Sequence, residues 1–256
     1  MIALTFTISH RYRAYVMDND PYQSRRFRAV LFDYFGTLTT AVQRGPAHRR
    51  IARMLNCDPD AWVALLDRTF YLRAAGQLGE PVETLRLLAG MLGARPRHDA
   101  LYMAFAARIT AVAQDGPLRP EAVPVLRAIR ARGLRTAVVS DCWYELPRVL
   151  PSLPVYPLLD ARVYSVAVGC CKPDPKIYLA ACAELGVAPE ECLYVGDGGS
   201  NELTGAADLG MTAVRLAAPD LAGHLSFSPD ARWAGPAVPG LPAIVDLLDR
   251  IPALAA

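Results

Sequence analysis

Short apolar segments that recur along the chain constrain its fold more than any other feature of the sequence. Each has four to six residues, and they occur at 29–32, 136–140, 163–168, 192–196 and 212–216. Segments of this length that are apolar at nearly every position predict strands buried on both faces. Helical patterns lie between most of them, as at 121–132 and 176–185. Strands that alternate with helices predict an α/β fold with a parallel sheet flanked by helices.

The interval between the first two predicted strands breaks this alternation. About a hundred residues there show helical patterns instead, at roughly 46–56, 59–75, 81–92 and 98–113. Asp58-Pro59 is a typical helix start, because aspartate caps the first turn and proline suits its first position. We therefore predict an all-helical domain at 43–117, inserted into a core formed by 28–42 and 118–256, with an N-terminal extension at 1–27.

Composition and charge exclude several classes of protein. Of the 256 residues 53% are hydrophobic, and 27 basic side chains stand against 25 acidic ones. The net charge of +2 rules out the broad basic surface expected of a protein that binds nucleic acid or an anionic membrane. No apolar run approaches the roughly 18 residues that span a bilayer, and the N-terminus lacks a signal-peptide pattern. We expect a cytoplasmic protein without nucleic-acid or membrane partners.

Polar side chains stand at the carboxyl ends of the predicted strands, where open parallel sheets bind their ligands. In chain order these residues are Asp33, Ser140, Lys172 and Asp197. Two carboxylates that face each other repel, which favours a divalent cation between them, and a nearby ammonium offsets the remaining charge. Lys172 stands out because the chain has 25 arginines and only one other lysine, Lys176.

The four segments around these residues resemble, in order and spacing, the four motifs of the haloacid dehalogenase (HAD) superfamily. They read VLFDYFGTLT, AVVSDCWYEL, CKPDPKIY and YVGDGGSNELTGA, and the helical insert falls where that superfamily carries its helical cap. The resemblance implies a Rossmann-like core in which Asp33 is the nucleophile and forms a covalent aspartyl intermediate. It also implies that magnesium is held by Asp33, Asp197 and the backbone carbonyl of Phe35.

The resemblance also implies candidates for binding the substrate. Ser140 would bind the transferred group, and Thr37 would support the loop that carries the nucleophile. Asp141 has two interpretations, because it either contacts the substrate or only complements the dipole of the following helix. Tyr178 fits the pattern of the dehalogenases, which phosphatases often share. Arg73, in the insert, is a further candidate for gripping a carboxylate or phosphate, although most arginines are expected on the surface.

Two charged residues complete the candidate site. By the resemblance, Lys172 would neutralise charge near the nucleophile Asp33. Glu202 stands where an aspartate is usual, and it would either support the metal or activate the hydrolytic water.

Two positions depart from the patterns of the superfamily in opposite directions. Its phosphatases carry a second aspartate, two residues after the nucleophile, as general acid and base, whereas this chain has Phe35 there. Such help is typically worth about 10²–10⁴-fold, so its loss argues against a fast phosphomonoesterase. The dehalogenases carry an aromatic residue at this position but lack Asp197 and work without magnesium. The first motif is thus dehalogenase-like and the fourth is phosphatase-like.

These observations leave three hypotheses for the function. The first is a magnesium-dependent hydrolase that cleaves a phosphoester of a small anionic substrate. The second is a 2-haloacid dehalogenase, which Phe35 and Tyr178 favour. The third is a ligand-binding or regulatory protein of low activity, since Phe35 removes a catalytic group. The sequence favours the first slightly, because Asp197 and Lys172 suit a metal-bound phosphoryl group.

Overall fold

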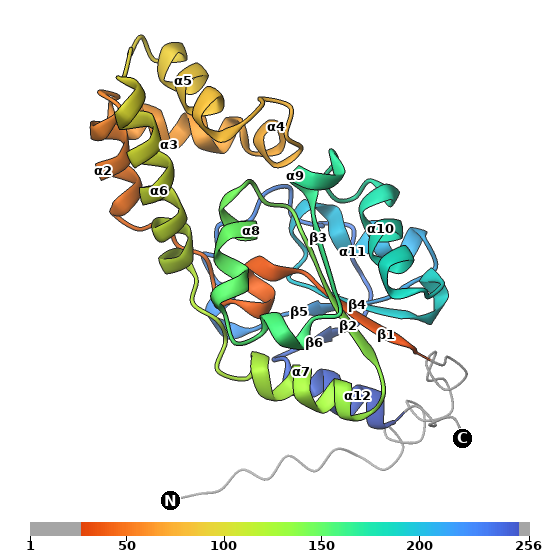
Figure 1. Cartoon of the computed structure of the whole chain (residues 1–256). Coiled ribbons are helices and arrows are strands. Elements are labelled where there is room, and N and C mark those ends of the chain that lie inside the picture. Colours follow the sequence, from red (N-terminus) through yellow and green to blue (C-terminus); the bar gives the residue numbers. More distant parts are fainter. Residues whose placement is uncertain (1–26, 251–256) are drawn as a thin grey trace, which may run out of the picture.

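The computed structural model describes residues 27–250 and, within them, one parallel sheet of six strands. The strands are β1 (Ala29–Phe32), β2 (Arg135–Ser140), β3 (Ala161–Tyr164), β4 (Cys192–Gly196), β5 (Thr212–Leu216) and β6 (Ala237–Val238). Their order is β3-β2-β1-β4-β5-β6, and every neighbouring pair is parallel. This confirms the predicted α/β class and places β1 between β2 and β4 (Figure 1). All but the last residue of the predicted extension, 1–27, lies outside the described residues.

Helices cover both faces of the sheet because the central strands are apolar on both faces. Each face of the sheet has its own hydrophobic core. The first core includes α7 (Ala122–Ala131), α8 (Glu145–Val149) and α12 (Pro242–Asp249), and the second core, on the other face, includes α10 (Pro175–Leu185) and α11 (Glu202–Asp208). In β1, Val30 and Phe32 belong to the first core. Ala29 and Leu31 belong to the second. Since alternate residues of a strand point to opposite faces, a strand covered on both sides must be apolar throughout.

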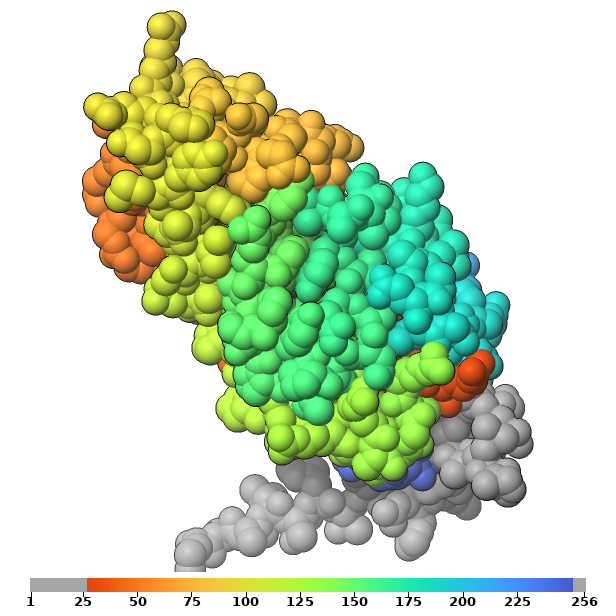
Figure 2. All heavy atoms as spheres, in the orientation of Figure 1, coloured from red at the N-terminus to blue at the C-terminus, as the bar shows by residue number. Residues whose placement is uncertain are grey.

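Most of the chain between β1 and β2, up to the start of α7, forms a separate group of helices, which we call the helical insert. Its helices are α2 (Ala47–Met54), α3 (Pro59–Arg68), α4 (Phe70–Ala74), α5 (Pro81–Met91) and α6 (His98–Asp115). They share a core that includes Trp62, Leu85 and Leu88. Figure 2 shows the orange and yellow side chains of the insert against the green part of the core. The boundaries of the insert as a domain stay a prediction.

The insert confirms the predicted helices, with one difference. The Asp58 side chain caps α3 by accepting hydrogen bonds from the N–H groups of Asp60 and Ala61. The helix expected at 59–75 is divided at Thr69, whose hydroxyl donates to the carbonyl of a residue one turn earlier. Even α6, the longest helix of the described residues with 18, is not apolar enough to cross a membrane.

The strand predicted at 163–168 is confirmed only at 163–164 and is wrong from Ser165 onward. Strand β3 ends at Tyr164, and a short helix, α9 (Ser165–Val168), follows. The Ser165 hydroxyl accepts a hydrogen bond from the N–H of Cys142 and lies 2.7 Å from the carbonyl oxygen of Ala74, to which it donates. These contacts to the core and to the insert turn the chain out of the sheet, and apolar content alone does not reveal them.

Two neighbouring leucines of α5 provide a test of the separate core of the insert. Leu88 is fully buried, whereas Leu87 is 48% exposed. We expect Leu88→Ala to lower the free energy of unfolding by about 2–5 kcal/mol, because it removes buried contacts and leaves a cavity. Leu87→Ala should change it by less than about 0.5 kcal/mol. Urea denaturation followed by circular dichroism measures both, and equal losses would contradict this packing.

Candidate active site

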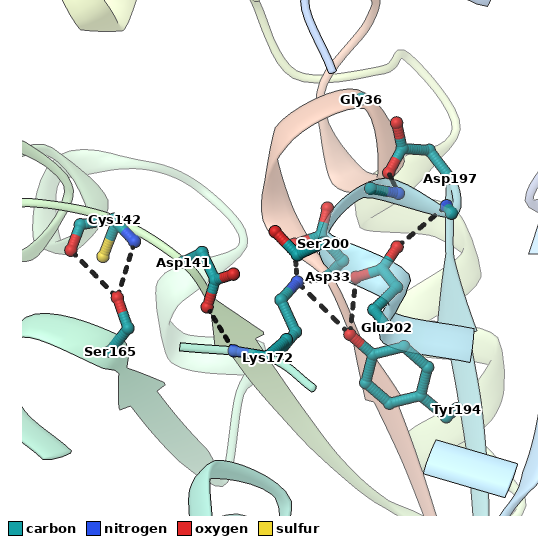
Figure 3. Close-up of polar contacts among 12 residues, drawn as sticks. Asp33, Gly36, Asp141, Cys142, Ser165, Lys172, Tyr194, Asp197, Ser200 and Glu202 are labelled. Carbon is teal, nitrogen blue, oxygen red and sulfur yellow. Dashed lines mark hydrogen bonds and ion pairs between the residues drawn. The ribbon is translucent and has the colours of Figure 1, made fainter. Parts of the chain in front are cut away.

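A buried ion cluster lies at the carboxyl ends of β1 and β4 (Figure 3). The Lys172 ammonium is 2.6 Å from Oδ1 of Asp33 and 2.6 Å from Oε2 of Glu202. The Tyr194 hydroxyl donates to the same glutamate oxygen at 2.8 Å, and the N–H of Gly198 donates to Oε1 at 2.9 Å. Both oxygens of Glu202 are therefore engaged by donors of the protein.

Contacts from distant segments hold the loop that follows β1. The N–H of Asp33 donates to the carbonyl of Val195 in the neighbouring strand. The Arg119 guanidinium donates to the carbonyls of Gly36 and Thr37, at 3.0 Å each. The loop is thus fixed from both sides, so the Asp33 carboxylate has one position relative to the sheet.

The charges of the cluster stabilise one another. Burial would lower the pKa of Lys172, but the negative charges of Asp33 and Glu202 outweigh this effect and raise that pKa well above its usual value. Burial raises the pKa of Asp33 and of Glu202, and the Lys172 charge opposes that rise. The lysine therefore stays charged and acts as counter-ion to both carboxylates. Because two carboxylates share one ammonium, the cluster favours a further positive charge.

Asp197 follows β4 and contacts a histidine that has no partner recognisable in the sequence. The N–H of Gly199 donates to Oδ1 at 3.0 Å, and Nε2 of His224 lies 3.2 Å from Oδ2. Burial would raise the pKa of Asp197, but these hydrogen bonds outweigh it and lower the pKa. The N–H of Val42 donates to Nδ1 of His224, so the ring proton is on Nε2 and faces Asp197. A β-carbon at Gly36 would lie 2.7 Å from Nε2, so only glycine fits there.

Three carboxylates of the site have oxygens close enough to share a cation. Those of Asp33, Asp197 and Glu202 lie within 4.8 Å of one another. Carboxylate oxygens are the ligands that magnesium prefers, so the residues present fit this ion. Glu202 accepts three hydrogen bonds from the protein, whereas Asp197 accepts two and Oδ1 of Asp33 accepts one, so Asp33 and Asp197 are the better candidates for direct ligands.

The cluster borders one cavity between the carboxyl edge of the sheet and the insert. The predicted site residues that line it are Asp33, Phe35, Asp141, Lys172, Asp197 and Glu202. The Phe35 ring packs edge-on against Tyr34, with 4.9 Å between ring centroids. Asp141 accepts a hydrogen bond from the N–H of Lys172 on Oδ1. Burial raises the pKa of Asp141, whereas this hydrogen bond and one from the Ser200 side chain lower it.

Three of the predicted residues do not line this cavity: Thr37, Ser140 and Tyr178. The hydroxyls of Thr37 and Ser140 are buried and lack hydrogen-bond partners within the part of the chain that the structure describes. The Tyr178 hydroxyl donates to the backbone carbonyl of Glu202 at 2.9 Å. Their contacts with a substrate stay predictions.

Sequence reasoning missed several residues that build the site. Tyr194 could have been found, because a tyrosine in a fully buried strand needs a partner for its hydroxyl. No comparable signal marks His224 or Arg119, since neither lies in a motif and both act on residues far away in the sequence. Arg73, by contrast, does line the cavity, as its prediction required.

A family model of haloacid dehalogenase-like hydrolases matches residues 27–210, and the chain belongs to this family. Over 102 residues it is 34% identical to a glyceraldehyde 3-phosphate phosphatase of Methanopyrus kandleri, covering 38% of this chain and 42% of that one. Over 111 residues it is 32% identical to (S)-2-haloacid dehalogenase 1 of a Pseudomonas species, covering 43% and 48%. The matches thus span less than half of these two relatives.

Solved structures share the fold. An L-2-haloacid dehalogenase of Xanthobacter autotrophicus superposes with a TM-score of 0.63 at 22% identity, covering 87% of this chain and 98% of that one. Similarity at this level of sequence identity shows a common fold, and the reaction has to be inferred from the residues of the site.

Gly196 provides a test of how closely Glu202 is packed. A β-carbon at this position would overlap Oε1 of Glu202. We expect Gly196→Ala to lower the free energy of unfolding by about 1–3 kcal/mol, because the glutamate must move away from the ammonium. Gly90→Ala is the control: a β-carbon in this turn of α5 meets no atom within 4 Å. It should raise the free energy of unfolding by up to about 1 kcal/mol. Chemical denaturation compares the two, and an unaffected Gly196→Ala protein would disprove the placement of Glu202.

Proposed function

We propose that the protein is a magnesium-dependent hydrolase that cleaves phosphoesters of small organic molecules in the cytoplasm. The observation that carries this proposal is the pair of carboxylates, Asp33 and Asp197, beside the Lys172 ammonium. By the family resemblance, the dehalogenases lack the carboxylate at the position of Asp197. The similarity to a relative named as a phosphatase supports a phosphorylated substrate.

Asp33 is the proposed nucleophile. Its Oδ1 is held by Lys172, so the other carboxylate oxygen attacks phosphorus while the bond from phosphorus to the ester oxygen breaks. The leaving group departs as an alkoxide or phenoxide, and an aspartyl phosphate forms. Bound magnesium, held by Asp33, Asp197 and the Phe35 carbonyl, would neutralise charge on the phosphoryl oxygens. Water then hydrolyses the aspartyl phosphate and releases phosphate. Lys172 keeps Asp33 ionised in its buried position.

Other residues are proposed to bind the substrate or to position these groups. The Ser140 hydroxyl, which is buried without a protein partner, is proposed to bind the transferred phosphoryl group. Asp141, which lines the cavity, is proposed to contact the substrate. Glu202 is a positioning residue, because both of its oxygens are engaged in holding Lys172 and the loop after β4.

The missing acid at residue 35 restricts the leaving group. Phe35 lines the cavity and has no proton to donate. Phosphoesters of acidic alcohols, such as phenols, need little protonation as they leave. We therefore expect aryl phosphates to be cleaved faster than alkyl phosphates.

The same observation favours 2-haloacid dehalogenation as the second candidate. A halide leaves without a proton, so an apolar ring at residue 35 suits that reaction. The similarity to a relative named as a dehalogenase supports this alternative. It requires no magnesium, which separates it from the first proposal.

Magnesium titration provides the direct test. We expect calorimetry to detect magnesium binding that Asp197→Asn weakens at least about tenfold, because a charged ligand becomes neutral. Asp99→Asn, at an exposed position of the insert, should bind like the native protein. Phosphate release from phenyl phosphate should require magnesium. Chloride release from 2-chloropropionate without phosphate release from any ester would overturn the proposal in favour of the second candidate.

A substitution at residue 35 tests the restriction on the leaving group. We expect Phe35→Asp to raise the rate of alkyl phosphate hydrolysis by about tenfold or more, because it supplies a general acid. The rate with aryl phosphates should rise less. Phe35→Asn is the matched control, because asparagine has nearly the same size as aspartate but no acidic proton. If both variants bind magnesium and neither gains activity, the absence of an acid at this position does not limit the reaction.

A further inference from the structure

The insert contributes a cationic wall to the cavity that contains the ion cluster. Three of its arginines line this cavity: Arg44, Arg73 and Arg108. Two of them have acidic partners. Arg44 lies 2.7 Å from Asp67, and Arg108 lies 2.5 Å from Glu145. The charge of the third is not balanced in this way.

Arg73 has no acidic partner within residues 27–250, although it is only 5% exposed. Its Nη2 donates to the carbonyl of Leu66 at 2.7 Å, and its Nε donates to the hydroxyl of Thr69 at 3.3 Å. Both acceptors are neutral. Burial, and then the positive charge of Arg108, lower the pKa of Arg73 to about 9, whereas the negative charges of Glu145 and Asp67 raise it, so it is still a cation at neutral pH. A buried cation that forms no direct ion pair is costly, and an anionic ligand in contact with it would reduce this cost.

Unused hydrogen-bond donors lie beside Arg73. The guanidinium groups of Arg73 and Arg108 lie 5.6 and 5.3 Å from the centre of the Trp143 ring. Nη1 of Arg108 and Nε1 of Trp143 are buried and have no hydrogen-bond partner in the described part of the chain. A buried donor without an acceptor costs about 1–3 kcal/mol. The wall thus combines a positive charge that forms no ion pair with N–H groups that have no hydrogen-bond acceptor.

We propose that Arg73, Arg108 and Trp143 form a second anion-binding subsite, which holds a carboxylate of the substrate. This inference rests on the proposed function and narrows its substrate class to small phosphoesters whose organic part carries a carboxylate. The planar guanidinium matches a carboxylate in geometry, and one negative charge balances the one arginine without a partner. Leu66, Phe70 and Leu146 also line the cavity, which favours an apolar or aromatic connection between phosphate and carboxylate.

A matched pair of aryl phosphates tests the subsite. Phenyl phosphate and 4-carboxyphenyl phosphate differ only in the carboxylate, and both have phenol leaving groups that suit a site without an acid at residue 35. With magnesium present, we expect kcat/KM to be at least about tenfold higher for the carboxylated ester. Such a ratio corresponds to about 1.4 kcal/mol of additional binding in the transition state.

Arg73→Met should bring this ratio close to one. Arg97→Met is the control, because the side chain of Arg97 is 87% exposed on the insert and the ratio should stay at its native value. The ratio for a given variant does not depend on how much of the protein is folded. Arg73→Lys, which keeps the charge and loses the planar fork, should give an intermediate ratio. A native ratio near one, or one that Arg73→Met leaves unchanged, overturns the subsite.

Benzoate separates the failure of the subsite from the failure of the proposed function. We expect benzoate to compete with 4-carboxyphenyl phosphate and to lose its binding in Arg73→Met, as measured by calorimetry. Benzoate binding that requires Arg73, in a protein that releases phosphate from neither ester, would support the subsite and contradict the phosphatase. Benzoate that binds without competing would assign the subsite to a separate carboxylate ligand and overturn its assignment to the substrate.

Discussion

The buried ammonium of Lys172 joins segments that are far apart in the sequence. It contacts Asp33 after β1 and Glu202 at the start of α11, and it lies 3.4 Å from the hydroxyl of Tyr194 in β4. Removing one partner of a buried ion pair typically costs about 3–5 kcal/mol, because the remaining charge is left uncompensated. The position of the candidate nucleophile therefore depends on this contact, and so does the fit of the loop after β4. A lysine at this position, in a chain with 25 arginines, agrees with a site in which a compact ammonium lies between two carboxylates.

The cavity has two charged ends of opposite sign. At the sheet, three carboxylates are clustered, two of them share the Lys172 ammonium, and the cluster fits a divalent cation. At the insert, Arg73 is buried and forms no direct ion pair among the described residues, because the nearby acids Asp67 and Glu145 are paired with Arg44 and Arg108. A ligand with a metal-bound phosphoryl group at one end and a carboxylate at the other would complement both ends. Substrate choice would then be decided by the insert, and the chemistry by the sheet.

The combination of Phe35 with Asp197 has a consistent physical explanation. In the proposed function, the Asp197 carboxylate would bind a metal that neutralises a highly charged transferred group, whereas the apolar ring of Phe35 would only remove the proton donor for the leaving group. These two properties are compatible when the leaving group is acidic. Such a site would resemble a phosphatase in what it binds and a dehalogenase in how its leaving group departs.

Local patterns in the sequence determined most of the sheet and the residues at its carboxyl edge. The segment AVLF predicts β1 because both of its faces must be covered, and Asp33 follows directly. Local patterns failed at 163–168, where contacts of Ser165 with the insert and with the loop after β2 replace the strand by a helix. Apolar content could not reveal this outcome, because the partners of Ser165 lie in segments that are distant in the sequence.

The sequence by itself determined which chemical groups stand at the ends of the strands, because these residues follow the apolar segments closely along the chain. Only the tertiary structure decided that His224 faces Asp197, that both oxygens of Glu202 are engaged, and that Arg73 has no counter-ion. Each of these properties depends on which distant segments pack together and on how much water they exclude. The burial and the ion pairing of a side chain depend on all the residues that surround it in space, and the order of residues along the chain does not specify these neighbours.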